Sequence, residues 1–270
     1  MRQDVEIVGK YRNRKEEKMH YREKKWLQNM IEKGTSLREI ARNEGVSHHT
    51  ISQWAKKFGL PTDIYRKTAK HCNLSPELIE FLDGLLLGRG TIVCRYPNTA
   101  YLSLAFNRKE YLEWISQELQ KLGIEQKGQI KKMVGKRKQY SSWRYESWSY
   151  YELVEIRKRW YQKRKKAIPQ DIRITPQVGL LWYLGSGYLE IQTKKRKTPF
   201  LRIRFSLGRY SEDEVRNLVK KIEEATSCKV KIYHCKPLKI TITPPEKFLS
   251  FIGPCPEELK PLFGKKWKIY

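Results

Sequence analysis

The sequence predicts an α+β protein in which a small all-helical domain precedes two copies of a larger unit. Two observations lead to this prediction: three short helical blocks lie in the first 61 residues, and a repeat relates the later parts of the chain. At 270 residues the chain exceeds the usual single domain of roughly 100–200 residues. We expect a helical domain at 1–61, a linker at 62–74, and two halves at 75–166 and 167–270.

The composition is strongly basic, with 56 Lys and Arg against 29 Asp and Glu and a formal net charge of +27. Such an excess indicates a polyanionic partner, because Lys and Arg gain affinity by releasing counterions condensed on phosphates. Nucleic acid is favoured over an anionic membrane surface. No run of 18 or more apolar residues is present, so we expect no transmembrane helix and no membrane partner.

Five cysteines, and an N-terminus without the apolar region of a secretory signal, predict a reducing cytoplasmic setting, associated with the nucleoid. No Cys-x-x-Cys pair occurs. A zinc site would require Cys228, His234 and Cys235 to converge, and buried inert thiols are the simpler interpretation. We therefore expect no metal and no cofactor.

Apolar residues between 24 and 60 recur at helical spacing in three blocks. Gly34 ends the first block, Ser36 and Ser47 can cap the second and third, and Gly45 makes the turn between those two. Three short helices with a glycine turn before the last predict a helix-turn-helix. A three-helix bundle that binds a protein is the alternative.

The third block begins with short polar side chains and continues into lysines. Polar groups at a helix N-terminus can read base edges in the major groove while lysines contact phosphates. The candidate DNA contacts in this helix are Ser47, His48, His49, Thr50, Gln53 and Lys56.

The rest of the chain repeats one pattern of elements. Ser75-Pro76 and Thr175-Pro176 each open an apolar helix, and each helix ends in Gly-x-Gly. Two strands, an amphipathic helix, two more strands and a final helix follow, so each half is predicted as αββαββα. The strands are expected at 91–95, 101–106, 129–134 and 139–148, then at 188–194, 200–205, 229–233 and 238–243, and the later helices at 108–122, 152–164, 211–226 and 246–252.

Alternation of apolar and polar residues gives each strand a buried face and a solvent-facing one. An ordinary solvated face is the alternative for any one strand, but repeated cationic strands favour a surface that reads a DNA groove, because an antiparallel ribbon fits the major groove. Lys131 and Lys194 lie in basic runs that we expect to contact phosphates. The remaining candidate contacts on the strands are Tyr101, Ser103, Arg202, Arg204, Lys229, Lys231 and Lys239.

The segments LDGLLLGRG (82–90) and GLLWYLGSG (179–187) resemble the two signature helices of a single-chain LAGLIDADG homing endonuclease. The segments 165–176 and 248–256 are similar to the connector and C-terminal helix of that family. The resemblance covers about residues 75–256. It implies a pseudo-twofold fold in which the two motif helices pack at the axis and the strands of both halves form a DNA-binding saddle.

In active members of that family an Asp or Glu precedes the last Gly of each motif, and the pair holds divalent metals at the scissile phosphates. This chain has Arg89 and Ser186 there. Arg has donors only and Ser is a weak neutral oxygen, so the resemblance implies degenerate catalytic positions, lost metal binding and no catalytic residue. Asp83 and Glu190 are the nearest acids, and neither is expected at the end of the helix pair.

We expect Arg89 to pair directly with a phosphate, converting a metal-dependent nuclease into a metal-independent binder. Decay of a selfish element is the alternative. The resulting hypothesis is a monomeric, sequence-specific binder of double-stranded DNA, acting as a transcriptional regulator. An RNA-binding intron-splicing maturase, or an active endonuclease with acids relocated to Glu190 or elsewhere, remain as alternatives.

Overall fold

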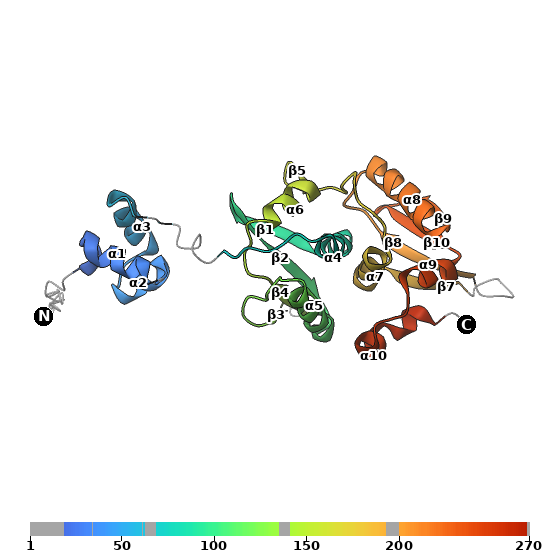
Figure 1. The fold of residues 1–270 in the computed structure, drawn as a ribbon, viewed down its shortest axis with the longest axis horizontal. Helices are drawn as coiled ribbons and strands as arrows, with labels where there is room; N and C mark the ends of the chain where they lie inside the picture. The colour runs from blue at the N-terminus through green and yellow to red at the C-terminus, as the bar shows by residue number, and fades with distance from the viewer. Residues whose placement is uncertain are drawn as a thin grey trace, which may run out of the picture. The chain divides into compact units, whose positions relative to one another are not determined.

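The computed structural model describes residues 19–33, 35–60, 62, 69–134, 141–192 and 200–268. The chain forms two compact units, Met1–Thr68 and Ala69–Tyr270 (Figure 1). Residues 69–74, which the sequence assigned to the linker, belong to the larger unit: Lys70 bridges to Tyr150, and the Cys72 amide donates to Glu152. Within the described residues, no helix is both long and apolar enough to cross a bilayer.

The smaller unit contains short helices around its own core. Their bounds are η1 His20–Arg22, α1 Lys24–Glu32, α2 Leu37–Asn43 and α3 His48–Lys57. Both predicted serine caps are confirmed, since Ser36 Oγ accepts from Glu39 N and Ser47 Oγ accepts from Thr50 N. Gly45 adopts φ 64° in the turn before α3, a conformation that favours glycine. Gly34 lies outside the described residues.

The larger unit contains the predicted repeat. The first half consists of α4 Pro76–Leu87, β1 Thr91–Tyr96, β2 Thr99–Phe106, α5 Lys109–Lys121, β3 Lys131–Val134, β4 Ser141–Glu146 and α6 Leu153–Trp160. The second consists of α7 Pro176–Ser186, β7 Tyr188–Gln192, β8 Phe200–Ser206, α8 Glu212–Thr226, β9 Lys229–Tyr233, β10 Lys239–Thr243 and α9 Pro245–Ile252. The sheets have the orders β1-β2-β4-β3 and β7-β8-β10-β9, so the topology matches strand for strand and the predicted α+β fold is confirmed.

The two motif helices α4 and α7 pack side by side between the sheets (Figure 1). A Cβ at Gly84 would lie 2.8 Å from Leu181 Cβ and 3.0 Å from the Val178 carbonyl oxygen, so only glycine fits this crossing. Gly88 and Gly185 also meet across it. Gly179, near the start of α7, instead makes room for the side chain of Ile252 in α9.

The first half departs from prediction after α6. The sequence indicated a helix to residue 164, but α6 ends at Trp160, and the strands β5 Tyr161–Gln162 and β6 Lys165–Lys166 form a hairpin. Tyr161 Oη accepts a hydrogen bond from the Ile92 amide at 3.2 Å, and this tertiary contact favours the hairpin over the basic helix.

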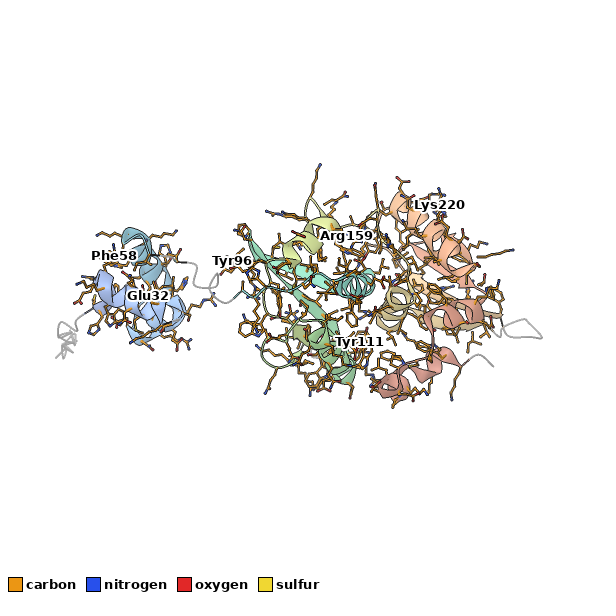
Figure 2. The ribbon with its side chains drawn as sticks, viewed as in Figure 1. Glu32, Phe58, Tyr96, Tyr111, Arg159 and Lys220 are labelled. Atoms are coloured by element: carbon orange, nitrogen blue, oxygen red, sulfur yellow. The ribbon has the colours of Figure 1, made fainter. Side chains whose placement is uncertain are left out.

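The second half is followed by η3 Glu257–Leu259, α10 Lys260–Phe263 and η4 Gly264–Trp267, which the sequence did not predict. Phe263 packs against Tyr111 of α5, with ring centroids 5.3 Å apart, and Tyr111 is labelled in Figure 2. A segment of the second half thereby reaches across to the first.

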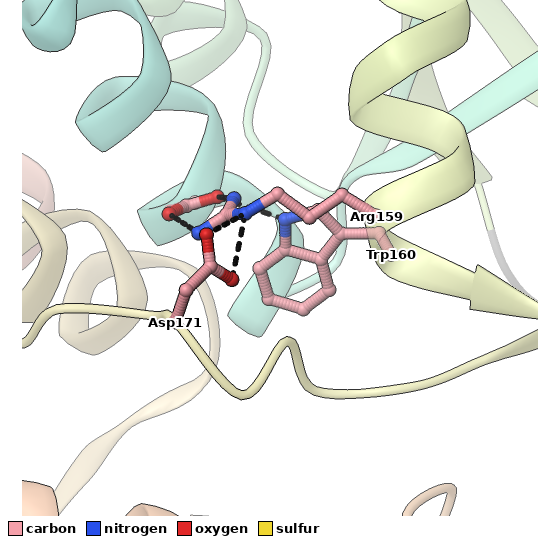
Figure 3. A network of polar contacts seen from close by, with 4 residues as sticks. Arg159, Trp160 and Asp171 are labelled. Carbon is pink, nitrogen blue, oxygen red and sulfur yellow. Dashed lines mark hydrogen bonds and ion pairs between the residues drawn. The ribbon is translucent and has the colours of Figure 1, made fainter.

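Asp83 in the motif helix α4 is buried in a polar network (Figure 3). Its carboxylate accepts from both Nη atoms of Arg159, at 2.6 and 2.9 Å, and from Trp160 Nε1 at 2.8 Å. Arg159 Nε also donates to Asp171 of the connector, at 2.8 Å. The network fixes α6 and the connector to the motif helix.

We expect Asp83→Ala to lower the free energy of unfolding by about 3 kcal/mol, because it leaves a largely buried guanidinium without its carboxylate. Asp171→Ala is the matched control: the Asp171 side chain is 71% exposed, so its loss should cost less than about 1 kcal/mol. Urea titration of both variants measures the difference. Equal effects would show that the buried pair is not the stabilising contact.

Candidate nucleic-acid interface

The carbonyl ends of α4 and α7 are each capped by a lysine. Lys166 Nζ donates to the carbonyl oxygens of Leu86 and Gly90, and Lys266 Nζ donates to those of Tyr183, Leu184 and Gly187 at 2.7–3.1 Å. In each half, the lysine follows the final helix of the αββαββα pattern. Ammonium groups are favourable there because the last carbonyls of a helix carry partial negative charge.

Burial lowers the pKa of both lysines. The pKa of Lys166 falls to about 7, chiefly through desolvation, with a further reduction from Arg209. The pKa of Lys266 falls to about 8, again through desolvation; Cys255 opposes the change and Arg89 adds to it. Sequence analysis missed both groups, although a Lys-Lys pair at 165–166 recurs at 265–266 and could have signalled them.

Arg89 and Ser186 stand near these capped ends. Arg89 is exposed, and its guanidinium lies 5.6 Å from the centre of the Phe106 ring. Ser186 is half-buried and its hydroxyl donates to the Trp182 carbonyl oxygen, 3.3 Å away. The helix ends therefore present the exposed guanidinium of Arg89 and the Ser186 hydroxyl, which is bonded within its own helix.

The sheet of the second half has one face on the helices and one face free of them. Phe205 stacks on Trp182 at 3.8 Å between ring centroids, so the neighbouring Arg202 and Arg204 point to the opposite side. Both arginines pair with Glu190 of β7. Arg202 is only 9% exposed, so it is less accessible than strand alternation suggested.

Three lysines lie on the next two strands of the same sheet, β10 and β9. Lys229 and Lys231 of β9 are exposed, and Lys239 of β10 is half-buried. Lys231 Nζ lies 5.6 Å from the centre of the Tyr233 ring. These three predicted residues come together on one surface, whereas Lys194 falls outside the described residues.

The sheet of the first half carries less charge. Ser103 is half-buried opposite Thr91, and Lys131 is exposed on the edge strand β3. Tyr101 is only 8% exposed, contrary to the solvent-facing position that alternation predicted. The guanidinium of Arg95 lies 5.1 Å from its ring centre and covers it.

In the smaller unit, the first turn of α3 uses some of its polar groups internally. Ser47 Oγ caps the helix and contacts Thr50 Oγ1 at 2.9 Å, and His49 Nε2 contacts Gln53 Nε2 at 3.0 Å. His48, His49, Gln53 and Lys56 are exposed. Ser47 is exposed as well, although its hydroxyl caps the helix, and Thr50 is half-buried.

A sequence profile of the LAGLIDADG DNA endonuclease family matches residues 79–243. The chain is also 31% identical over 201 residues to uncharacterized protein MJ1098 of Methanocaldococcus jannaschii, covering 72% of this chain and 74% of that protein. The chain belongs to the LAGLIDADG DNA endonuclease family. The fold agrees: the homing endonuclease I-WcaI, solved bound to its DNA recognition sequence, superposes with a TM-score of 0.62 at 19% identity, covering 80% of this chain and 97% of the other.

The LAGLIDADG resemblance implies divalent metals at the motif ends, but the residues present here do not fit them. Arg89 is cationic, and the Ser186 hydroxyl is bonded to its own helix. The carbonyl oxygens at the ends of the two motifs accept hydrogen bonds from Lys166 and Lys266. Asp83 and Glu190 are already paired with arginines. Within the described residues, no three His, Cys, Asp or Glu side chains are arranged to hold a metal ion.

The buried lysines should make the stability of this LAGLIDADG domain depend on pH. In the unfolded chain both regain their ordinary pKa of 10.5, so from about pH 7 or 8 up to 10.5 the unfolded chain binds more protons. The two lysines therefore add stability as the pH rises above about 7 to 8. Above about pH 9 the thiols of Cys72, Cys94, Cys228 and Cys255 oppose this rise, because burial raises their pKa in the folded chain. We expect the urea midpoint to increase between about pH 7 and about pH 9, and to increase less in Lys266→Met. Identical increases in the two proteins would contradict this account.

Proposed function

We propose that this protein binds a long, asymmetric site in double-stranded DNA without cleaving it, and that it acts as a transcriptional regulator. The proposal rests on one observation: where the family requires two carboxylates, this chain has Arg89 and Ser186 beside two capping lysines. The Arg89 guanidinium attracts phosphates directly and repels divalent metals. A protein that binds a DNA site without cleaving it acts by occupying that site, which is how a transcriptional regulator works.

The duplex, as opposed to RNA, is supported by the shape of the sheets and by the fold shared with a DNA-bound homing endonuclease. Two similar sheets in one chain suit a monomer that contacts two half-sites. Their different side chains suit an asymmetric sequence, because one sheet carries Arg202 and Arg204 where the other carries Tyr101 and Ser103. In this proposal the protein works in the cytoplasm, associated with the nucleoid.

We further propose that the smaller unit is a helix-turn-helix that adds a second DNA contact. Its third helix exposes His48, His49, Gln53 and Lys56 along one surface, with both serine caps formed. A tethered second module raises overall affinity through effective concentration alone. Residues 62–68 would then serve as the linker.

The proposal is tested by selecting genomic DNA fragments on the protein in chelator and then adding Mg²⁺. We expect recovery of a defined duplex sequence, bound without metal and left intact afterwards. Cleavage on adding Mg²⁺ would show an active endonuclease with relocated acids. Preference for a structured intron RNA over the duplex would favour a maturase.

We expect Arg89→Asp to weaken binding of the selected duplex in chelator by about tenfold or more, since a carboxylate would replace a phosphate-pairing guanidinium. Ser186→Ala is the matched control at the equivalent position of the other motif and should change the dissociation constant less than about twofold. Fluorescence anisotropy at fixed salt measures both. Tighter binding by Arg89→Asp would overturn the proposed role of Arg89.

A further inference from the structure

An acidic residue lies on the cationic face of the second sheet, on its edge strand β7. Glu190 of β7 stands directly opposite Arg202 of β8, and Tyr188 stands opposite Arg204. Glu190 Oε2 accepts from Arg202 Nε and, at 2.8 Å, from Arg204 Nη2. All three side chains are largely buried, with 22% of Glu190, 11% of Arg202 and 17% of Arg204 exposed.

The two arginines differ in how completely they are bonded. Arg202 donates to Glu190 and also to Tyr233 Oη at 2.9 Å. Arg204 has one short contact, to Glu190, while its Nη1 is 3.4 Å from Tyr188 Oη and its buried Nε has no partner among the described residues. Arg202 is therefore held within the sheet, whereas each Nη atom of Arg204 carries a second N–H that these contacts do not use.

The four strand positions of this cluster are occupied by different side chains in the first half. The strand register places Thr91 and Val93 of β1, and Tyr101 and Ser103 of β2, at the positions of Tyr188, Glu190, Arg202 and Arg204. None of these four side chains is charged. At these four positions only the second half carries charged side chains.

A carboxylate on a DNA-binding surface opposes the phosphates, so a purely electrostatic surface gains nothing from Glu190. A carboxylate that fixes the direction of a guanidinium has a different use. Arginine held in one orientation can donate two parallel hydrogen bonds to O6 and N7 of guanine, whereas a mobile arginine pairs with any phosphate.

We propose that Glu190 is a positioning residue that holds Arg204 to read a guanine in the major groove of the half-site bound by the second half. This inference rests on the proposed binding of duplex DNA. It adds the base that is read, the half-site that contains it, and the residue that makes the reading selective.

The test uses the full chain and the duplex recovered in chelator, with each G·C pair of the second half-site replaced in turn by A·T. In the parent protein we expect one replacement to weaken binding about tenfold. In Glu190→Gln and in Arg204→Lys the same replacement should change affinity less than about twofold. Because each result is a ratio of affinities for two duplexes, it does not depend on the fraction of folded protein.

Lys231→Gln is the matched control on the same face. We expect it to weaken every duplex equally and to reduce the salt dependence, while the guanine preference stays intact. Glu190→Gln should have the opposite signature: removal of a negative charge leaves non-specific affinity unchanged or tighter, and only the preference disappears.

Full retention of the guanine preference in Glu190→Gln would overturn this inference and leave duplex binding standing. So would a uniform weakening on all duplexes, because that is the behaviour of a structural residue. Failure of the parent protein to select any duplex would overturn the proposed function together with this inference.

Discussion

The close contact between α4 and α7 is the constraint on which the larger unit depends. Gly84 brings the helices so near that a single methyl group would meet Leu181 Cβ and the Val178 carbonyl. This contact sets the distance between the two sheets, since each sheet packs on its own motif helix. It also brings the two helix ends together, and with them Arg89, Ser186 and the two capping lysines.

Electrostatics at those ends follow from the same contact. Two helices that end side by side gather unsatisfied carbonyl oxygens in one place, and such oxygens attract cations. Here the cations are supplied by the chain itself, as Lys166 and Lys266, at the cost of burying two ammonium groups. The formal charge of +27 thus includes two lysines that lie beneath the surface.

The sequence was sufficient where local chemistry determines structure. The caps at Ser75 and Thr175 and the Gly-x-Gly ends define the repeat, and strand alternation gives each sheet its buried face. Sequence analysis failed where contacts between residues distant in the chain determine the structure. A run rich in Lys and Arg predicts helix, yet Lys163 and Arg164 adopt positive φ in a hairpin held by contacts to β1. Alternation could not show that Arg95 covers Tyr101, or that Glu190 takes up both arginines of β8.

The segment after α9 has a consequence for the order in which the protein matures during synthesis. Lys166 caps α4 before α7 has been made, so the first motif helix is completed by its own half. Lys266 and Phe263 leave the ribosome only after every element that they contact, including Tyr111 of the first half. The contact of Phe263 with Tyr111, which joins the two halves, can therefore form only after both halves have been synthesised.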